Sequence, residues 1–297
     1  MVYILPPPFR RNLQVMPRWH AVWLCSLLNT CSSLILANCS LPGPKLRMSA
    51  VHVEVTSDFA CPWCHVGKAR LNAAVKDFER LSHPDDATRI PKVHVSYRPY
   101  MIDVRTQPNG EDYLAYNERR WGGDGWTTSM KSRSARKDGC EFAKWVTWPN
   151  SLLAHRLQMF AERAGKGDQV NGLVFHTIYE RGGNASDLET LVSLAEEAGL
   201  SPAEARAYLR SREGEDDVLR NDRTAKTELG VRGVPYFVVR AAEPEAEIAS
   251  DSGSTAAAAD AAGASSGGGK GRPAEVVLKG AVGTDELLRA FAAVSPR

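Results

Sequence analysis

The sequence is poor in cysteine and distributes it unevenly. Six cysteines occur in 297 residues, and three of them precede residue 40. The other three are Cys61, Cys64 and Cys140. A secreted fold stabilised by disulfide bonds carries even numbers of cysteines spread through its core, and that framework is missing here. One close pair with one leftover thiol instead favours redox chemistry or metal binding.

The sequence also lacks an excess of positive or negative charge. The 37 basic and 35 acidic residues leave a net charge of +2. This balance gives no electrostatic reason to expect nucleic acid or an anionic membrane as a partner. With 43% hydrophobic and 24% charged residues, the composition is that of an ordinary globular protein. The length allows one large domain or two smaller ones.

Residues 1–47 lack aspartate and glutamate altogether, and the first acidic residue is Glu54. Three arginines precede the apolar run Ala21–Ala37, a layout typical of a targeting peptide. The run is short for a membrane span and is interrupted by polar residues, so we expect no stable span. In the alternative interpretation, translation starts at Met48 and the protein is cytoplasmic. A genuine targeting peptide would instead indicate an organelle or the secretory pathway.

The part of the sequence that follows begins with a strand–helix–strand pattern. Val51–Thr56 alternates apolar and polar residues, which predicts a strand. An amphipathic helical pattern covers 71–78, and a second alternating stretch covers 93–97. This order favours a parallel βαβ unit.

The middle of the chain is predicted to be helical. Residues 101–147 are polar and suggest loops with short helices, and helical patterns strengthen from Ser151 onward. Capping boxes are predicted at Ser186 with Glu189 and at Ser201 with Glu204. We therefore expect a first part of one domain at 48–100, an inserted helical domain at 101–212, and the second part of the first domain at 213–297.

The last part of the sequence predicts two strands and a helix. The strands are Tyr236–Val239 and Glu275–Leu278, and a helix begins at Thr284. Between the strands, Ser250–Gly269 consists only of Ser, Asp, Gly, Thr and Ala, so we predict a disordered loop at about 241–274. The order β-α-β, helices, β-β-α predicts an α/β, thioredoxin-like fold with an inserted all-helical domain.

Reactive chemistry is concentrated in Cys61-Pro62-Trp63-Cys64, between the first strand and the first helix. This position places Cys61 at a helix N-terminus, where unpaired N–H groups and the helix dipole stabilise a thiolate. Cys61 is therefore predicted to be the attacking thiol and Cys64 the resolving thiol. Pro62 suits an early helical position, and Trp63 is expected to shield the pair and offer an apolar contact.

Three other interpretations of this motif compete. Cys61–His65 also matches the attachment sequence of c-type haem, although haem proteins rarely place it between a strand and an amphipathic helix. A structural zinc site prefers four ligands, and no second C-x-x-C is present, so we expect no bound metal. The third interpretation is an inert structural disulfide.

A second signal lies far along the chain, where Gly233-Val234-Pro235-Tyr236 precedes a predicted strand. Thioredoxin-like folds place a cis-proline at this point, facing the two cysteines. A cis X-Pro bond turns the chain sharply and leaves the preceding backbone, here that of Val234, free to pair with an extended substrate. Pro235 is therefore predicted to be a third functional residue.

Other candidates rest on weaker signals. His65 directly follows the pair and is a candidate for tuning it. Trp148 is a candidate for lining a substrate groove, and His155 is either a buried, hydrogen-bonded side chain or a substrate contact. Residues expected to pack or to be bystanders are Trp121, Trp126, Trp145 and Cys140.

These motifs resemble the DsbA family, in particular its cytosolic FrnE-like branch. The resemblance spans residues 51–240 and 275–294 and implies a thioredoxin domain interrupted by a helical domain. It further implies disulfide oxidoreductase activity, with Cys61, Cys64 and Pro235 as functional residues. The motifs that carry it are Ser57–Cys64 with Gly67-Lys68, Pro149-Asn150-Ser151, Ala154-His155-Arg156, Gly199-Leu200, Gly230–Val238 and Gly280-Ala281.

Some residues depart from the pattern of this branch. It often has an aromatic or apolar residue after the C-x-x-C motif and glutamine after the late Gly-Ala, where this chain has His65 and Val282. These departures concern tuning and partner choice more than reaction type. Pro-Trp between the cysteines also matches neither the Gly-Pro of reductants nor the Pro-His of strong oxidants, so the direction of exchange stays open.

The expected function is thiol–disulfide exchange with thiol- or disulfide-containing proteins or small thiols. We expect no bound cofactor, and glutathione is a candidate redox partner. Kappa-class glutathione transferases and 2-hydroxychromene-2-carboxylate isomerases share the architecture but carry a serine-containing motif, which makes their function the second hypothesis. A redox-inert peptide-binding module or chaperone is the third. The sequence assigns no oligomeric state.

Overall fold

The computed structural model describes residues 51–82, 92–241 and 275–295. The predicted N-terminal extension at 1–47 lies outside these residues. The predicted loop at 241–274 also lies outside them, apart from Ala241 at the end of a strand. None of the described helices is long and apolar enough to cross a membrane.

A four-stranded sheet forms the base of the described structure, in the order β2-β1-β5-β6. The first strand, β1 (Val51–Ser57), is parallel to β2 (Val93–Pro99). It is antiparallel to β5 (Tyr236–Ala241), which pairs in turn with β6 (Glu275–Lys279). The predicted βαβ unit and the two late strands are thus confirmed.

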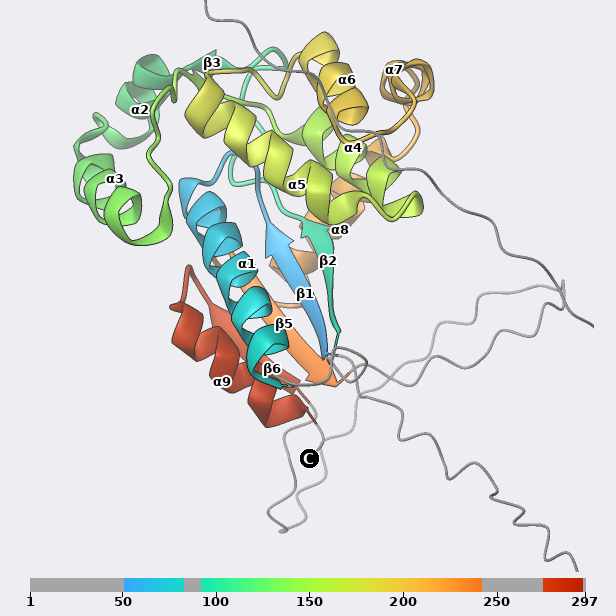
Figure 1. Cartoon of the computed structure of the whole chain (residues 1–297). Coiled ribbons are helices and arrows are strands. Elements are labelled where there is room, and N and C mark those ends of the chain that lie inside the picture. Colours follow the sequence, from blue (N-terminus) through green and yellow to red (C-terminus); the bar gives the residue numbers. More distant parts are fainter. Residues whose placement is uncertain (1–50, 83–91, 242–274, 296–297) are drawn as a thin grey trace, which may run out of the picture. The chain divides into compact units, whose positions relative to one another are not determined.

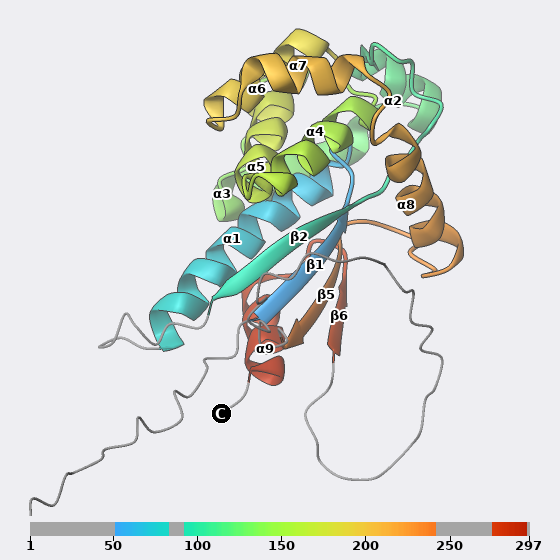
Figure 2. The ribbon, with the colours of Figure 1, turned by 90° about the vertical axis from the view of Figure 1, so that its right-hand side faces the viewer.

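Two helices, α1 (Pro62–Ser82) and α9 (Thr284–Val294), pack together on one face of the sheet (Figure 1). Their apolar sides meet the alternating valines of β1 in one buried cluster, in which Phe78 lies against Phe291. Figure 2 shows α8 (Glu215–Thr227) on the opposite face, where it contacts β2. The sheet is therefore covered on both sides by helices, as the α/β prediction requires.

The remaining helices gather beyond the carboxyl end of β1 (Figure 1). Their chain segments all lie between β2 and β5, and a short antiparallel strand pair accompanies them. The elements are β3 (Glu111–Asp112), α2 (Tyr113–Trp121), α3 (Gly125–Asp138), β4 (Thr147–Trp148), α4 (Leu152–Arg163), α5 (Gly167–His176), the π-helix η2 (Thr177–Arg181), α6 (Leu188–Glu197) and α7 (Pro202–Arg210).

The hydrophobic core of this helical region includes the start of α1. Phe59, Ala60, Cys61 and Cys64 belong to the same buried cluster as the helices, whereas the later turns of α1 belong to the sheet cluster. The cysteine motif therefore lies where the two cores meet. Packing from both sides fixes the position of its backbone.

The N-cap predicted at Ser201 is confirmed, and the one predicted at Ser186 is wrong. Ser201 caps α7, since its hydroxyl accepts a hydrogen bond from the N–H of Glu204. At α6 the cap is Asp187 instead of Ser186, whose hydroxyl already accepts a bond from the N–H of Asn150. A carboxylate caps a helix as well as a hydroxyl does, so tertiary pairing decides between the neighbours.

Candidate active site

The turn between β1 and α1 places Cys61 directly before the first residue of the helix, Pro62. The N–H of Cys61 donates to the carbonyl of Asp58 at 3.0 Å, which closes the turn. The carbonyl of Cys61 accepts from the N–H of Cys64 at 2.9 Å and so begins the helical hydrogen bonding. The first turn of α1 carries no acidic side chain that would oppose a thiolate.

A buried carboxylate fixes this turn against the chain that follows β2. Asp58 is 1% exposed, and its two oxygens accept hydrogen bonds from the N–H of Ala60 at 3.0 Å and the N–H of Ile102 at 2.6 Å. His155 lies 3.7 Å from the same carboxylate and donates its Nε2–H to the carbonyl of Tyr100. His155 is thus buried and hydrogen-bonded beneath the turn, the first of the two roles considered for it.

Two distant segments meet at the sulfur of Cys61. Its Sγ lies 3.6 Å from the carbonyl oxygen of Val234, and the Val234–Pro235 peptide bond is cis. Cys61 and Cys64 are both free thiols, 4% and 2% exposed. Burial, followed by the adjacent Cys61, raises the pKa of the Cys64 thiol well above its usual value. Cys64 therefore stays protonated at neutral pH.

The close approach of α1 to Pro235 depends on Gly67. A Cβ atom added at Gly67 would lie 2.8 Å from the Pro235 ring and 3.4 Å from Phe237. The next residue, Lys68, is buried and pairs with Asp168 at 2.6 Å. The Gly-Lys dipeptide thus serves the packing of the site, by letting α1 approach Pro235 and then anchoring α1 to α5.

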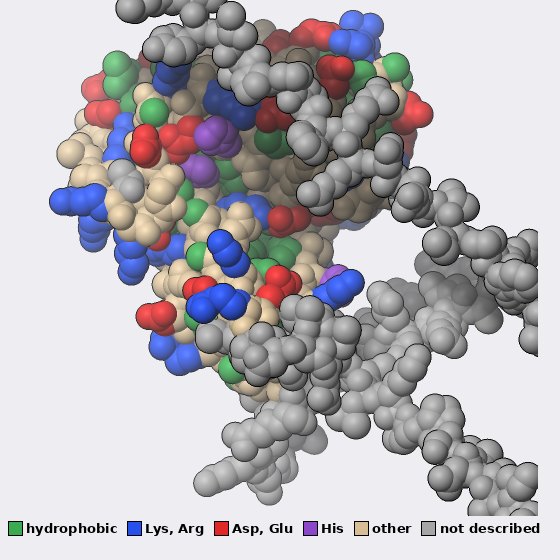
Figure 3. Space-filling model, in the orientation of Figure 1, with side chains coloured by type: hydrophobic (Ala, Val, Ile, Leu, Met, Phe, Trp, Pro, Cys, Tyr) green, Lys and Arg blue, Asp and Glu red, His purple; other side chains and the backbone are tan. Residues whose placement is uncertain are grey.

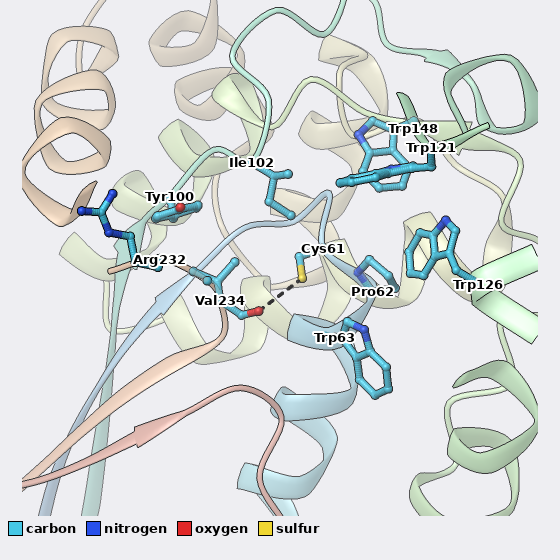
Figure 4. Close-up of a pocket in the computed structure, with 11 residues that line it drawn as sticks. Cys61, Pro62, Trp63, Tyr100, Ile102, Trp121, Trp126, Trp148, Arg232 and Val234 are labelled. Carbon is cyan, nitrogen blue, oxygen red and sulfur yellow. Dashed lines mark hydrogen bonds between the residues drawn. The ribbon is translucent and has the colours of Figure 1, made fainter. Parts of the chain in front are cut away.

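A cavity of about 650 Å³ opens above Cys61. Cys61, Pro62 and Trp63 line its base from the start of α1, and Trp148 lines it from the helical region. Figure 4 shows two more indoles, of Trp121 and Trp126, on one side of the sulfur. The other side is formed by Tyr100, Ile102 and the segment Arg232–Val234. Cys64 does not line the cavity.

The residues predicted to pack include two that belong to the site. Trp121 and Trp126 flank the Gly-rich turn between α2 and α3 and face the cavity, although no local pattern distinguishes them from packing residues. Arg232 was not predicted either. Its position two residues before the cis bond was the available signal, since this segment was expected to face the cysteines.

His65 lies behind the cysteine pair and does not line the cavity. Its Nε2 pairs with Glu180 at 3.0 Å, and its ring stacks on Tyr179, whose hydroxyl donates to the carbonyl of Phe59. Burial raises the pKa of Glu180, but hydrogen bonds from His65 and from the N–H groups of Ala143 and Phe142 outweigh it and lower that pKa to about 2. This pair ties α1 to η2.

The surface beside the indoles carries an excess of positive charge. Figure 3 shows Lys and Arg side chains gathered over α2 and α3, at the left of the view. On α3 the one acidic residue, Asp138, is bound by Arg70 at 2.9 Å. Three basic residues of α3 form no ion pair with a carboxylate among the described residues: Arg133, Arg136 and Lys137. This charge attracts anionic groups toward the cavity.

Metal-binding geometry is not found in the described ranges. There, no group of three or more His, Cys, Asp and Glu side chains is arranged to hold a metal ion. Cys140 is buried and does not line the cavity, and burial, with Asp138 and Glu180, raises the pKa of its thiol to about 12. The histidine that would complete a haem attachment sequence, His65, is engaged by Glu180.

Comparison with known proteins places this geometry in a family. A family model for the DSBA-like thioredoxin domain matches residues 52–261, more than half of the chain. The chain belongs to this family. The uncharacterized protein YwbO of Bacillus subtilis (strain 168) is 29% identical over 191 residues, which are 64% of this chain and 86% of that protein.

A solved structure shows the same fold. A probable DsbA oxidoreductase from Streptomyces coelicolor superposes with a TM-score of 0.58 at 22% identity, covering 82% of this chain and 89% of the other. The cytosolic disulfide reductase DsbM from Pseudomonas aeruginosa gives a TM-score of 0.45 at 16% identity, covering 65% and 85%. The resemblance drawn from the sequence motifs is thus confirmed for the family and the thioredoxin-like fold.

Replacing Gly67 by alanine tests the close approach of α1 to Pro235. Alanine favours the helix by about 1 kcal/mol, but overpacking a filled interior costs about 1–3 kcal/mol. We expect Gly67→Ala to lower the free energy of unfolding in urea. Gly172→Ala in α5 is the matched control, because its added Cβ would meet no atom within 4 Å, and it should stabilise the protein. Equal stabilisation by both variants would contradict the packing argument.

Replacing Glu180 by glutamine tests the pair behind the motif. Because the folded-state pKa of about 2 lies below the ordinary value of 4.5, Glu180 stabilises the fold above pH 4.5, and this contribution is lost as the pH falls toward 2. Glu180→Gln should cost about 1–3 kcal/mol at pH 7 and flatten the loss of stability below pH 4.5. Urea denaturation at several pH values measures both effects, with Glu118→Gln as an exposed control. An unchanged acid slope would refute the assignment.

Proposed function

We propose that this protein is a thiol–disulfide oxidoreductase in which Cys61 is the attacking thiol. The observation that carries the proposal is the different setting of the two cysteines. Cys61 lies at the helix N-terminus, lines the cavity and contacts the Val234 carbonyl, whereas Cys64 is buried beneath it with a raised pKa. Membership of the DSBA-like family supports the same chemistry.

The proposed cycle begins when the Cys61 thiolate attacks one sulfur of a substrate disulfide. A bond forms between Cys61 and that sulfur, and the second substrate sulfur leaves as a thiolate that takes a proton from solvent. Cys64 then loses its proton and attacks the Cys61 sulfur, which releases the first substrate sulfur. Two electrons pass to the substrate, and a Cys61–Cys64 disulfide remains. The reverse sequence oxidises a substrate dithiol.

The raised pKa of the Cys64 thiol explains why Cys61 attacks first and Cys64 second. A protonated Cys64 does not compete with Cys61 for the incoming disulfide, since only a thiolate attacks efficiently. Once Cys61 is bound to substrate, the repulsion between the two sulfurs that opposes ionisation of Cys64 is gone. Ionisation then becomes easier at the moment when the second attack is needed.

The backbone around Val234 gives the substrate a place to bind. In the proposed complex, an extended substrate segment pairs with this backbone beside the Cys61 sulfur. No bound cofactor takes part in the cycle, and a small thiol such as glutathione serves as the external redox partner. Substrates are thiol- or disulfide-containing polypeptides or small thiols.

Two cysteine variants test the assignment. Cys61→Ser should abolish disulfide exchange, because serine cannot form the mixed disulfide. Cys64→Ser should retain the first attack but accumulate a mixed disulfide with substrate, detectable by mass spectrometry and released by dithiothreitol. Full exchange by Cys61→Ser would overturn the assigned roles. Cys140→Ser is the control, because its thiol is buried away from the cavity, and its turnover should match that of the wild type.

The reduction potential of the pair distinguishes the activity from its rivals. Equilibration against glutathione buffers should reveal a reversible two-electron couple. A potential below about −250 mV fits a reductase, and one above about −180 mV fits an oxidase or isomerase. No couple at all would reject the proposal in favour of a glutathione-binding transferase or a redox-inert peptide-binding module.

A further inference from the structure

The two indoles from the α2–α3 corner are held in place although they are exposed. Trp121 and Trp126 are 48% and 38% exposed, and their rings meet edge to face with centroids 6.4 Å apart. The indole N–H of Trp126 donates to Asn117 at 3.0 Å, and Asn117 is itself fully buried and bonded to the helix backbone. The guanidinium of Arg120 lies over Trp121 at 4.4 Å.

Holding two large apolar rings partly in water costs free energy unless a partner covers them. The N–H of Trp126 is already bonded to Asn117, and the guanidinium of Arg120 lies over the Trp121 ring, so the surface that the two rings offer the cavity is mostly apolar. Figure 4 shows both rings on the same side of Cys61, next to Trp148. Together with Trp63 at the base, these rings form an aromatic wall suited to a large apolar side chain.

The opposite side of the cavity has a different character. Figure 4 shows Arg232 and Tyr100 across the sulfur from the indoles. Arg232 has no carboxylate partner among the described residues, and its guanidinium is free to bind one. The cavity thus has an apolar end, a cationic end and the reactive sulfur between them.

We infer that the preferred substrate is a polypeptide segment whose cysteine lies between a large apolar residue and an acidic residue. The apolar side chain would pack on Trp121 and Trp126, and the carboxylate would pair with Arg232. The cavity volume of about 650 Å³ suits a segment of a few residues rather than a folded surface. This inference rests on the proposed exchange at Cys61.

The same geometry disfavours glutathione as a tightly recognised substrate. Glutathione carries two carboxylates and an ammonium group but no large apolar group. A carboxylate of glutathione can pair with Arg232, but the aromatic wall would stay uncovered. We therefore expect glutathione to act as a weakly bound redox partner.

Capped pentapeptides joined to glutathione through a mixed disulfide provide the test. One peptide has its cysteine between tryptophan and glutamate, a second replaces the tryptophan with serine, and a third replaces the glutamate with glutamine. Each is prepared in both residue orders. The full-length reduced protein is assayed for kcat/KM. Burying a large aromatic side chain should favour the tryptophan peptide at least about tenfold, and an exposed ion pair should favour glutamate about two- to fivefold.

Variants assign each preference to its end of the cavity. Trp121→Ala and Trp126→Ala should each reduce the preference for tryptophan, and Arg232→Gln should remove the preference for glutamate. Trp126→Ala loses the hydrogen bond to Asn117 and with it some stability. Trp121 donates no hydrogen bond in the structure, so Trp121→Ala tests the preference for tryptophan even if Trp126→Ala fails to fold. Leu114→Ala is the matched control, since it lies on α2 with 61% exposure and away from the cavity, and it should keep both preferences.

Two further measurements separate this inference from the proposed function. Hydroxyethyl disulfide has neither an apolar ring nor a carboxylate, and its turnover reports exchange alone. If it is turned over while all peptides react equally, the inference fails and the oxidoreductase function stands. Affinities of the same peptides with serine in place of cysteine test recognition without chemistry. Equal affinities would overturn the inference even if no disulfide were turned over.

Discussion

The buried Asp58 carboxylate is the constraint on which the site depends. It accepts hydrogen bonds from the N–H groups of Ala60 and Ile102, so the cysteine turn and the segment after β2 share one anchor. His155 approaches the same carboxylate from α4, which connects the helical region to this anchor. Removing a buried acceptor leaves its donors unpaired at a cost of about 1–3 kcal/mol. The position of the Cys61 sulfur is thus determined by a network in which sheet, loop and helices all take part.

The site is composite because the reactive sulfur and most of the aromatic wall come from different parts of the chain. The thioredoxin-like elements supply the reactive sulfur, its helix N-terminus and the cis Val234–Pro235 backbone. The helical region between β2 and α8 supplies Trp121, Trp126 and Trp148 of the aromatic wall and the buried support behind the motif. Different segments of the chain therefore determine the type of reaction and the preference for substrates. Changes in the α2–α3 corner can alter which substrates react while the exchange chemistry at Cys61 stays the same.

The meeting of the Cys61 and Val234 segments was predicted from the topology of thioredoxin-like folds. Local patterns were sufficient to predict the four strands of the main sheet and most helices, although they missed the short strands β3 and β4. They were sufficient because alternation and helical periodicity reflect which residues face a core. These patterns failed where tertiary contacts determine which residue caps a helix, faces the cavity or forms an ion pair. Asp187, not Ser186, caps α6 because Ser186 pairs with Asn150. Trp121 and Trp126 face a cavity instead of a core, a distinction that depends on how a Gly-rich corner folds over a distant helix. The Glu180 partner of His65 lies 115 residues away in sequence.

The hairpin of β5 and β6 has its two ends at very different distances from the chemistry. Tyr236 begins β5 next to Pro235, whereas Arg240 pairs with Glu275 at the far end of the hairpin, with an ion pair of 3.0 Å. The chain that connects the two strands leaves from this far end. Insertions, deletions or an attached reporter domain at that point would be separated from the sulfur by the length of the sheet. The described strand ends, Ala241 and Glu275, are therefore suitable attachment points for changes that leave the catalytic end of the fold untouched.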